Sequence, residues 1–120
     1  MRVVVKKVGA KPVVRDIPNS LAAMQKEVGG YIEVVSLSKC IKLICNEEGR
    51  LLGLPMNFEL FGSAIVGNVF FCAVDESGED FVSLSPEMCD RLVRTFERGF
   101  NIEFCGGNLH GKHLQRLLGL

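Results

Sequence analysis

Apolar residues recur along this chain in short runs, each bounded by glycine, proline or a polar cluster. The β-branched runs 2–8 and 12–17 are separated by a short turn, and they predict an antiparallel hairpin. Further strands are expected at 31–37 and 40–45. A tight turn then leads into a short return strand at 50–54. The first half of the chain therefore predicts a sheet made of neighbouring strands.

The next part of the chain has a less regular pattern. One helical turn is expected at 57–61. The run 65–74 is strand-like with Gly67 inside it, and a glycine in a strand indicates a bulge. A polar turn at 75–80 then precedes a strand at 81–84, which we expect to pair with the strand before it.

Two segments have the three- and four-residue spacing of an amphipathic helix. The first covers residues 21–28 and ends at a Gly-Gly pair, because glycine adopts the left-handed cap conformation without strain. The second begins after the capping residue Ser85, with proline at its first position, and ends at Gly99. The apolar face of the first helix is predicted to contain Leu21, Met24 and Val28.

This order of elements predicts an α+β fold, with a twisted, mainly antiparallel sheet and two helices packed on one face. Residues 1–99 are expected to form a single domain. Residues 100–120 form a C-terminal tail, whose leucines need either the domain core or another subunit to cover them. The tail is thus a candidate docking or oligomerisation segment, and we expect a homo-oligomer.

Net charge, cysteine content and the length of the apolar runs limit the classes of function that the chain can have. The 120 residues have a formal net charge of zero, which does not favour general attraction to nucleic acid. The five cysteines include no Cys-x-x-Cys pair, and buried free thiols in a reducing compartment explain them best. No apolar run approaches the ~18 residues of a membrane span, and no signal-peptide pattern is present. We therefore expect a cytoplasmic protein that does not bind membranes.

Four motifs occur in a fixed order: VGGYIEVVSL, CNEEGRLLGLPMN, IVGNVFF and SGEDFVSLS. Together they resemble a family of small domains of unknown function from Gram-positive bacteria, their phages and mobile elements, over about residues 2–97. The resemblance brings no established catalytic residues. It implies a phage or mobile-element setting inside a bacterial cell, where small accessory proteins often counter host defence, an inference from setting alone.

Basic residues on the second helix provide the clearest candidate site. Arg91, Arg94 and Arg98 recur at spacings of three and four, so they share one side of the helix. Guanidinium groups bind phosphate oxygens in a bidentate manner, although such a row is also typical of a solvated helix face that pairs with acids. If a phosphate-bearing ligand binds here, its polar edges are expected to contact Asn46, Asn57 and Tyr31.

Two acidic turns are weaker candidates. Glu47 and Glu48 are adjacent and point in opposite directions on extended backbone, which disfavours a shared proton or metal. The 75–80 turn lacks the spacing of a calcium-binding loop, and a solvated hairpin tip explains it better.

The tail contains the only pattern that suggests a metal or a nucleophile. Cys105, His110 and His113 are residue types that bind zinc, and His-x-x-His places both imidazoles on one helical side. A fourth ligand is not apparent nearby. A Cys105 nucleophile with a histidine base is the related alternative, but nothing in the sequence orients the base.

Three functions follow from these patterns. The first is a non-enzymatic accessory protein, without a cofactor, that sequesters a phosphate-bearing small molecule such as a nucleotide signal. The second is a protein–protein inhibitor or adaptor that acts through the acidic loops or the tail. The third is a zinc- or Cys/His-dependent enzyme.

Overall fold

The computed structural model describes residues 1–60 and 62–98. This part of the chain contains two helices and eight strands, and the strand pairs are all antiparallel. The predicted α+β class is therefore confirmed. The 100–120 tail, with its leucines and its predicted role in oligomerisation, lies outside the described residues.

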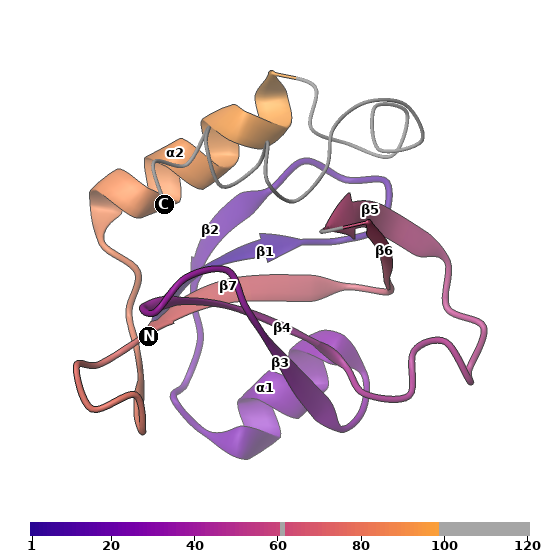
Figure 1. Cartoon of the computed structure of the whole chain (residues 1–120), viewed down its shortest axis with the longest axis horizontal. Helices are drawn as coiled ribbons and strands as arrows, with labels where there is room; N and C mark the ends of the chain where they lie inside the picture. Colours follow the sequence, from indigo (N-terminus) through magenta and orange to yellow (C-terminus); the bar gives the residue numbers. More distant parts are fainter. Residues whose placement is uncertain (61, 99–120) are drawn as a thin grey trace.

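The larger sheet has six strands, and its order is β2-β1-β7-β4-β3, with β8 paired to β7 (Figure 1). Its central strand, β7, therefore joins the N-terminal hairpin to the β3–β4 hairpin. The strands are β1 (Arg2–Lys6), β2 (Val13–Asp16), β3 (Ile32–Ser36), β4 (Ile41–Asn46), β7 (Val69–Val74) and β8 (Phe81–Val82).

A separate two-stranded sheet is formed by β5 (Met56–Leu60) and β6 (Ser63–Val66). Two predictions are wrong here: residues 57–60 of the expected helical turn belong to strand β5, and residues 50–53 of the expected return strand form a turn. The β5 main chain pairs with β6, and this pairing places Phe58 and Leu60 in the core.

The run predicted as one strand at 65–74 is divided between β6 and β7. Gly67 lies between the two strands with a φ of 76°, a conformation that favours glycine, and its N–H donates to the Pro55 carbonyl at 2.8 Å. The glycine thus ends one strand instead of forming a bulge within it.

Both helices form where the sequence predicts them. Helix α1 (Leu21–Val28) is capped by the Ser20 hydroxyl, which accepts from the Ala23 N–H, and it ends at Gly29 in the left-handed conformation. Helix α2 (Pro86–Glu97) is capped by Ser85 in the same way. The short polar side chains at both N-caps satisfy N–H groups that the helix leaves without partners.

The two helices lie on opposite faces of the sheet, not on one face as the sequence suggested (Figure 1). The reason is the continuous apolar run in β1, where Val4 points toward α2 while Val3 and Val5 point toward α1. A strand that is apolar on both sides needs cover on both sides. Leu21 does not join the α1 core and remains exposed.

The α2 face contains the larger core. Strand residues Val4, Leu43 and Phe71 pack there with residues of α2, and the β5–β6 hairpin covers the rest. On the other face, Met24 and Val28 of α1 cover a smaller core that includes Ile44, Phe70 and Cys72.

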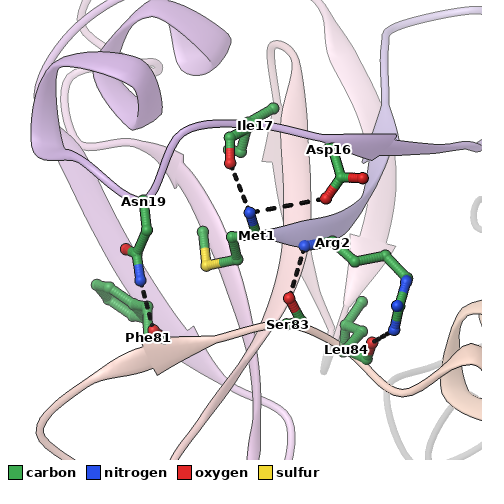
Figure 2. Close-up of polar contacts among 8 residues, drawn as sticks. All are labelled: Met1, Arg2, Asp16, Ile17, Asn19, Phe81, Ser83 and Leu84. Atoms are coloured by element: carbon green, nitrogen blue, oxygen red, sulfur yellow. Dashed lines mark hydrogen bonds and ion pairs between the residues drawn. The ribbon is translucent and has the colours of Figure 1, made fainter.

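Hydrogen bonds tie the start of the chain to the segment that leads into α2 (Figure 2). The Arg2 N–H donates to the Ser83 hydroxyl and its guanidinium donates to the Leu84 carbonyl, both at 2.8 Å. The Asn19 amide donates to the Phe81 carbonyl at 2.9 Å. These contacts anchor the segment before α2 to β1 and to the loop before α1.

Candidate functional site

The predicted arginine row lies on the exposed side of α2. The Arg94 guanidinium is 3.0 Å from the Asp90 carboxylate of the same helix, and both side chains are largely exposed. Arg91 and Arg98 are exposed as well. The i, i+4 pair neutralises the central guanidinium at least in part, and exposed pairs of this kind contribute little to stability. Phosphate binding by this row stays a prediction.

Asn57 is buried and fully engaged within the fold. Its amide nitrogen donates to the Lys6 carbonyl at 2.8 Å and to the Gly67 carbonyl at 2.9 Å, while its oxygen accepts from the Lys6 ammonium at 3.0 Å. Both amide hydrogens are used, so the side chain has none to donate to a ligand. We therefore leave Asn57 out of the proposed site.

A strand irregularity explains how Asn57 reaches this position. The β5–β6 register shifts between Met56 and Phe58, so Asn57 is the extra residue of a bulge. Asn57 and Phe58 are both buried although they are neighbours in the strand. The bulge thus breaks the alternation that would turn one of them outward.

Asn46 is buried and joins α1 to the loop after β4. Its amide donates to the Val28 carbonyl at 3.2 Å, and its oxygen accepts from the Glu48 N–H at 2.8 Å. Gly30 leaves space for this amide, because a Cβ atom at Gly30 would lie 2.8 Å from the Asn46 nitrogen. Asn46 therefore links the loop after β4 to the C-terminal end of α1.

A shallow cavity of about 220 Å³ lies above Asn46. A second one of about 310 Å³ adjoins it and shares Asn46 and Leu52. Of the predicted site residues, Tyr31 and Asn46 come together here, and none of the α2 arginines lines either cavity. The first cavity is lined by Gln25, Gly30, Tyr31, Asn46, Glu48 and Leu52.

The loop of residues 47–55 is a compact turn with its own main-chain bonds. Leu52 N–H donates to the Glu48 carbonyl at 2.9 Å, and Leu54 N–H donates to the Gly49 carbonyl at 3.0 Å. The Arg50 guanidinium also donates to the Ala64 carbonyl at 3.1 Å, which ties the loop to β6. The loop is thus held in one shape.

This ordered loop carries its apolar side chains toward solvent. Leu51 is 87% exposed and Leu52 is 59% exposed, and Tyr31, which lines the same cavity as Leu52, is 63% exposed. We call Tyr31, Leu51 and Leu52 the loop patch. The sequence pattern did not reveal it, because the two leucines were assigned to a strand; their position between Arg50 and Gly53, inside a polar turn, was the available signal.

Two glycines of this loop have different roles. Gly53 has the left-handed conformation, with φ 67°. Gly49 is needed for space, because a Cβ atom there would lie 2.8 Å from Val66 Cγ2 and 3.3 Å from the Asn46 carbonyl oxygen. The loop therefore packs directly against β6.

Gly67→Ala is expected to lower the free energy of unfolding by about 2 kcal/mol, because it adds left-handed strain to a contact of 2.8 Å with Leu54 Cδ1. Gly53→Ala is the matched control: it has the same strain but open space around the Cβ, so about 1 kcal/mol is expected. Urea denaturation measures both. Equal losses would show that Leu54 moves aside at no cost.

The acidic 75–80 turn is a hairpin tip between β7 and β8, as predicted. The Ser77 hydroxyl donates to the Asp75 carboxylate at 2.6 Å, and this bond holds the pKa of Asp75 below its ordinary value. The carboxylate is used to shape the turn. Among the described residues, no group of three or more Cys, His, Asp or Glu side chains is placed to bind a metal ion.

The three buried cysteines of the described residues do not provide an activated nucleophile. Burial raises the pKa of Cys45 to about 11 and that of Cys72 to about 12, and it also raises the pKa of Cys89. These thiols remain protonated at neutral pH, whereas the thiolate is the reactive form. Cys105, His110 and His113, the predicted zinc or catalytic residues, lie outside the described residues.

The comparison with protein families adds one finding. Residues 1–97 match the model of a domain of unknown function, DUF3846. The chain belongs to this family. The match agrees with the resemblance to an uncharacterised family of small domains, and the family description assigns no activity to DUF3846. No curated protein and no solved structure gave a significant match. Within the described part of this DUF3846 chain, no helix is long and apolar enough to cross a membrane.

Proposed function

We propose that this DUF3846 domain is a non-enzymatic adaptor or inhibitor that binds a partner protein through the loop patch. The observation that carries the proposal is the exposure of Leu51 and Leu52 on a loop held in one shape, with Tyr31 exposed at the cavity that Leu52 also lines. Exposed apolar side chains with a polar rim are typical of interaction surfaces. A large aromatic residue at such a surface is a frequent hot spot.

The charges around the loop patch indicate the chemistry of the partner. Glu47 and Glu48 are both exposed at the start of the loop, and Glu48 also lines the cavity beside Tyr31. A partner that places an apolar side chain against Leu52 and a lysine or arginine near these carboxylates would match both features. This corresponds to the adaptor or inhibitor that the acidic loops suggested.

The biological setting of the proposal comes from the resemblance. A DUF3846 protein of a phage or mobile element would act in the cytoplasm of its bacterial host, and its partner would be a host defence protein. The rival function, sequestration of a nucleotide signal by the α2 arginines, ranks second. Its central residue, Arg94, already has a counter-charge in Asp90.

The test uses the full chain as bait. Leu51→Ser with Leu52→Ser is expected to weaken the partner complex at least thirtyfold, since truncating hot-spot residues costs about 2 kcal/mol or more. Val13→Ser is the matched control, because Val13 is a similarly exposed aliphatic residue, 52% exposed, on strand β2. Partners are isolated from bacterial host lysate, and their dissociation constants are then measured by titration calorimetry.

Two results would contradict the proposal. One is the absence of any stoichiometric partner, and the other is a partner that binds the double variant as tightly as the unmodified chain.

A nucleotide panel in a thermal-shift assay tests the rival function, sequestration of a nucleotide by the α2 arginines. Stabilisation that is lost with Arg91→Ala and Arg94→Ala, but kept in the leucine variants, would replace protein binding with nucleotide sequestration.

A further inference from the structure

Along the strand order β2-β1-β7-β4-β3 of the large sheet, the two outer strands are β2 and β3, while the two-residue β8 pairs with β7 off this path (Figure 1). Within the described residues, β2 pairs only with β1, and β3 pairs only with β4. An outer strand presents main-chain N–H and C=O groups to another chain, and native proteins usually protect such edges. The two edges of this sheet differ in how far they are protected.

The register identifies the main-chain groups of β3 that face outward. The Tyr31 carbonyl accepts from the Glu47 N–H at 2.8 Å, and the Leu37 N–H donates to the Ile41 carbonyl at 3.0 Å. Bonding in an antiparallel pair alternates along the strand, so Glu33 and Val35 also bond toward β4. The N–H and C=O groups of Ile32, Val34 and Ser36 therefore point away from the sheet.

The β2 edge is protected by its sequence. Pro12 directly precedes β2 and has no N–H, and Arg15 and Asp16 place charges on the strand. Strand β3 has no proline, and its one charged residue is Glu33, whose main-chain groups bond toward β4, so its three outward positions are uncharged. At their centre, Val34 is 45% exposed. The β3 edge is therefore the open one.

We propose that β3 pairs with the β3 strand of a second copy of this chain, antiparallel, about a two-fold axis at Val34. In this register Val34 faces Val34, and Ile32 faces Ser36 of the other copy. Each of these pairs would exchange two main-chain hydrogen bonds. The two sheets would become continuous, and the inference does not depend on the proposed function.

The sequence of β3 favours the register centred on Val34 over the two registers centred one residue to either side. Centring the axis on Glu33 would place the two Glu33 carboxylates directly opposite each other, which is destabilising. Centring it on Val35 would place Ile32 opposite Ser38, beyond the end of β3. The Val34 register pairs the whole strand with itself and places Glu33 opposite Val35. Self-pairing is therefore compatible with the charges on this edge.

Val34→Pro tests the interface in the full chain. Proline at this position removes an outward N–H and leaves the bonds between β3 and β4 intact. Val14→Pro is the matched control, because Val14 is also 45% exposed and its N–H also points outward, on the protected β2 edge. By sedimentation velocity, the unmodified chain and Val14→Pro are expected at twice the mass of one chain. Val34→Pro is expected at the mass of one chain, with a dissociation constant at least tenfold higher.

A second variant, without proline, controls for the case in which Val34→Pro fails to fold. Val34→Lys would place two ammonium groups at the axis and is also expected to give a monomer, with the circular dichroism spectrum of the unmodified chain. A monomeric unmodified chain at millimolar concentration would overturn the proposal. So would dimers of Val34→Pro and Val34→Lys, which would assign association to another surface such as the 100–120 tail.

Discussion

Replacing Asn57 with alanine is expected to lower the free energy of unfolding by about 3 kcal/mol, measured by urea denaturation. The change deletes two hydrogen bonds to the carbonyls of Lys6 and Gly67 and a third from the Lys6 ammonium. Asn57 is buried, so the carbonyls that it leaves do not regain water easily. The bulge of β5 would lose the side chain that ties it to β1.

Asn19→Ala is the control for this prediction. Asn19 also donates through its amide to a main-chain carbonyl, that of Phe81, but at an exposed position. We expect its loss to cost less than about 1 kcal/mol, because water replaces the bond. If the two variants were equally stable, Asn57 would not serve as a structural residue, and it would return to the list of ligand-binding candidates.

Phe58→Ala is expected to be more destabilising, by about 3–5 kcal/mol, the usual range for deleting a buried phenylalanine. The ring of Phe58 is completely buried. Its centroid lies 5.2 Å from that of Phe96 in an edge-on arrangement and 6.2 Å from that of Phe71 in a stacked one. Phe58 thus connects three elements, the small hairpin, α2 and the central strand.

Thermal and urea unfolding measure this loss, with Tyr31→Ala as the control. Tyr31 is also aromatic but is largely exposed, so its substitution is expected to change stability by less than about 0.5 kcal/mol. A loss below about 1 kcal/mol for Phe58→Ala would show that the hairpin does not contribute to the α2 core.

The parts of the fold that local chemistry determines could be predicted from the sequence. Ser85 followed by Pro86 indicates a helix start, and a Gly-Gly pair indicates the end of α1. The side of the sheet on which a helix packs depends on tertiary structure. The continuous apolar run in β1 was a usable signal for cover on both faces, but it does not say which helix covers which face.

The candidate site was harder to predict, because a polar residue in a sequence does not reveal whether it is buried. Asn46 and Asn57 were taken as ligand-binding residues, and the fold uses their amides for internal bonds. Leu51 and Leu52 were assigned to a short return strand, although a turn exposes them. For the two asparagines, the deciding contacts come from segments distant in the chain, Val28 and Lys6. For the two leucines, the deciding bonds are local ones within the turn.

The central position of β7 has a consequence for biosynthesis. Strands β1 and β4 each need β7 as their neighbour, but β7 ends only at Val74. A nascent chain that has emerged only as far as β4 has two separate hairpins and no shared core. Folding must therefore await the later residues and close long sequence separations, which makes it slow for a chain of this size. During that interval the ribosome-bound segment carries apolar strands with no core to cover them, a state that is prone to aggregation and that chaperones bind.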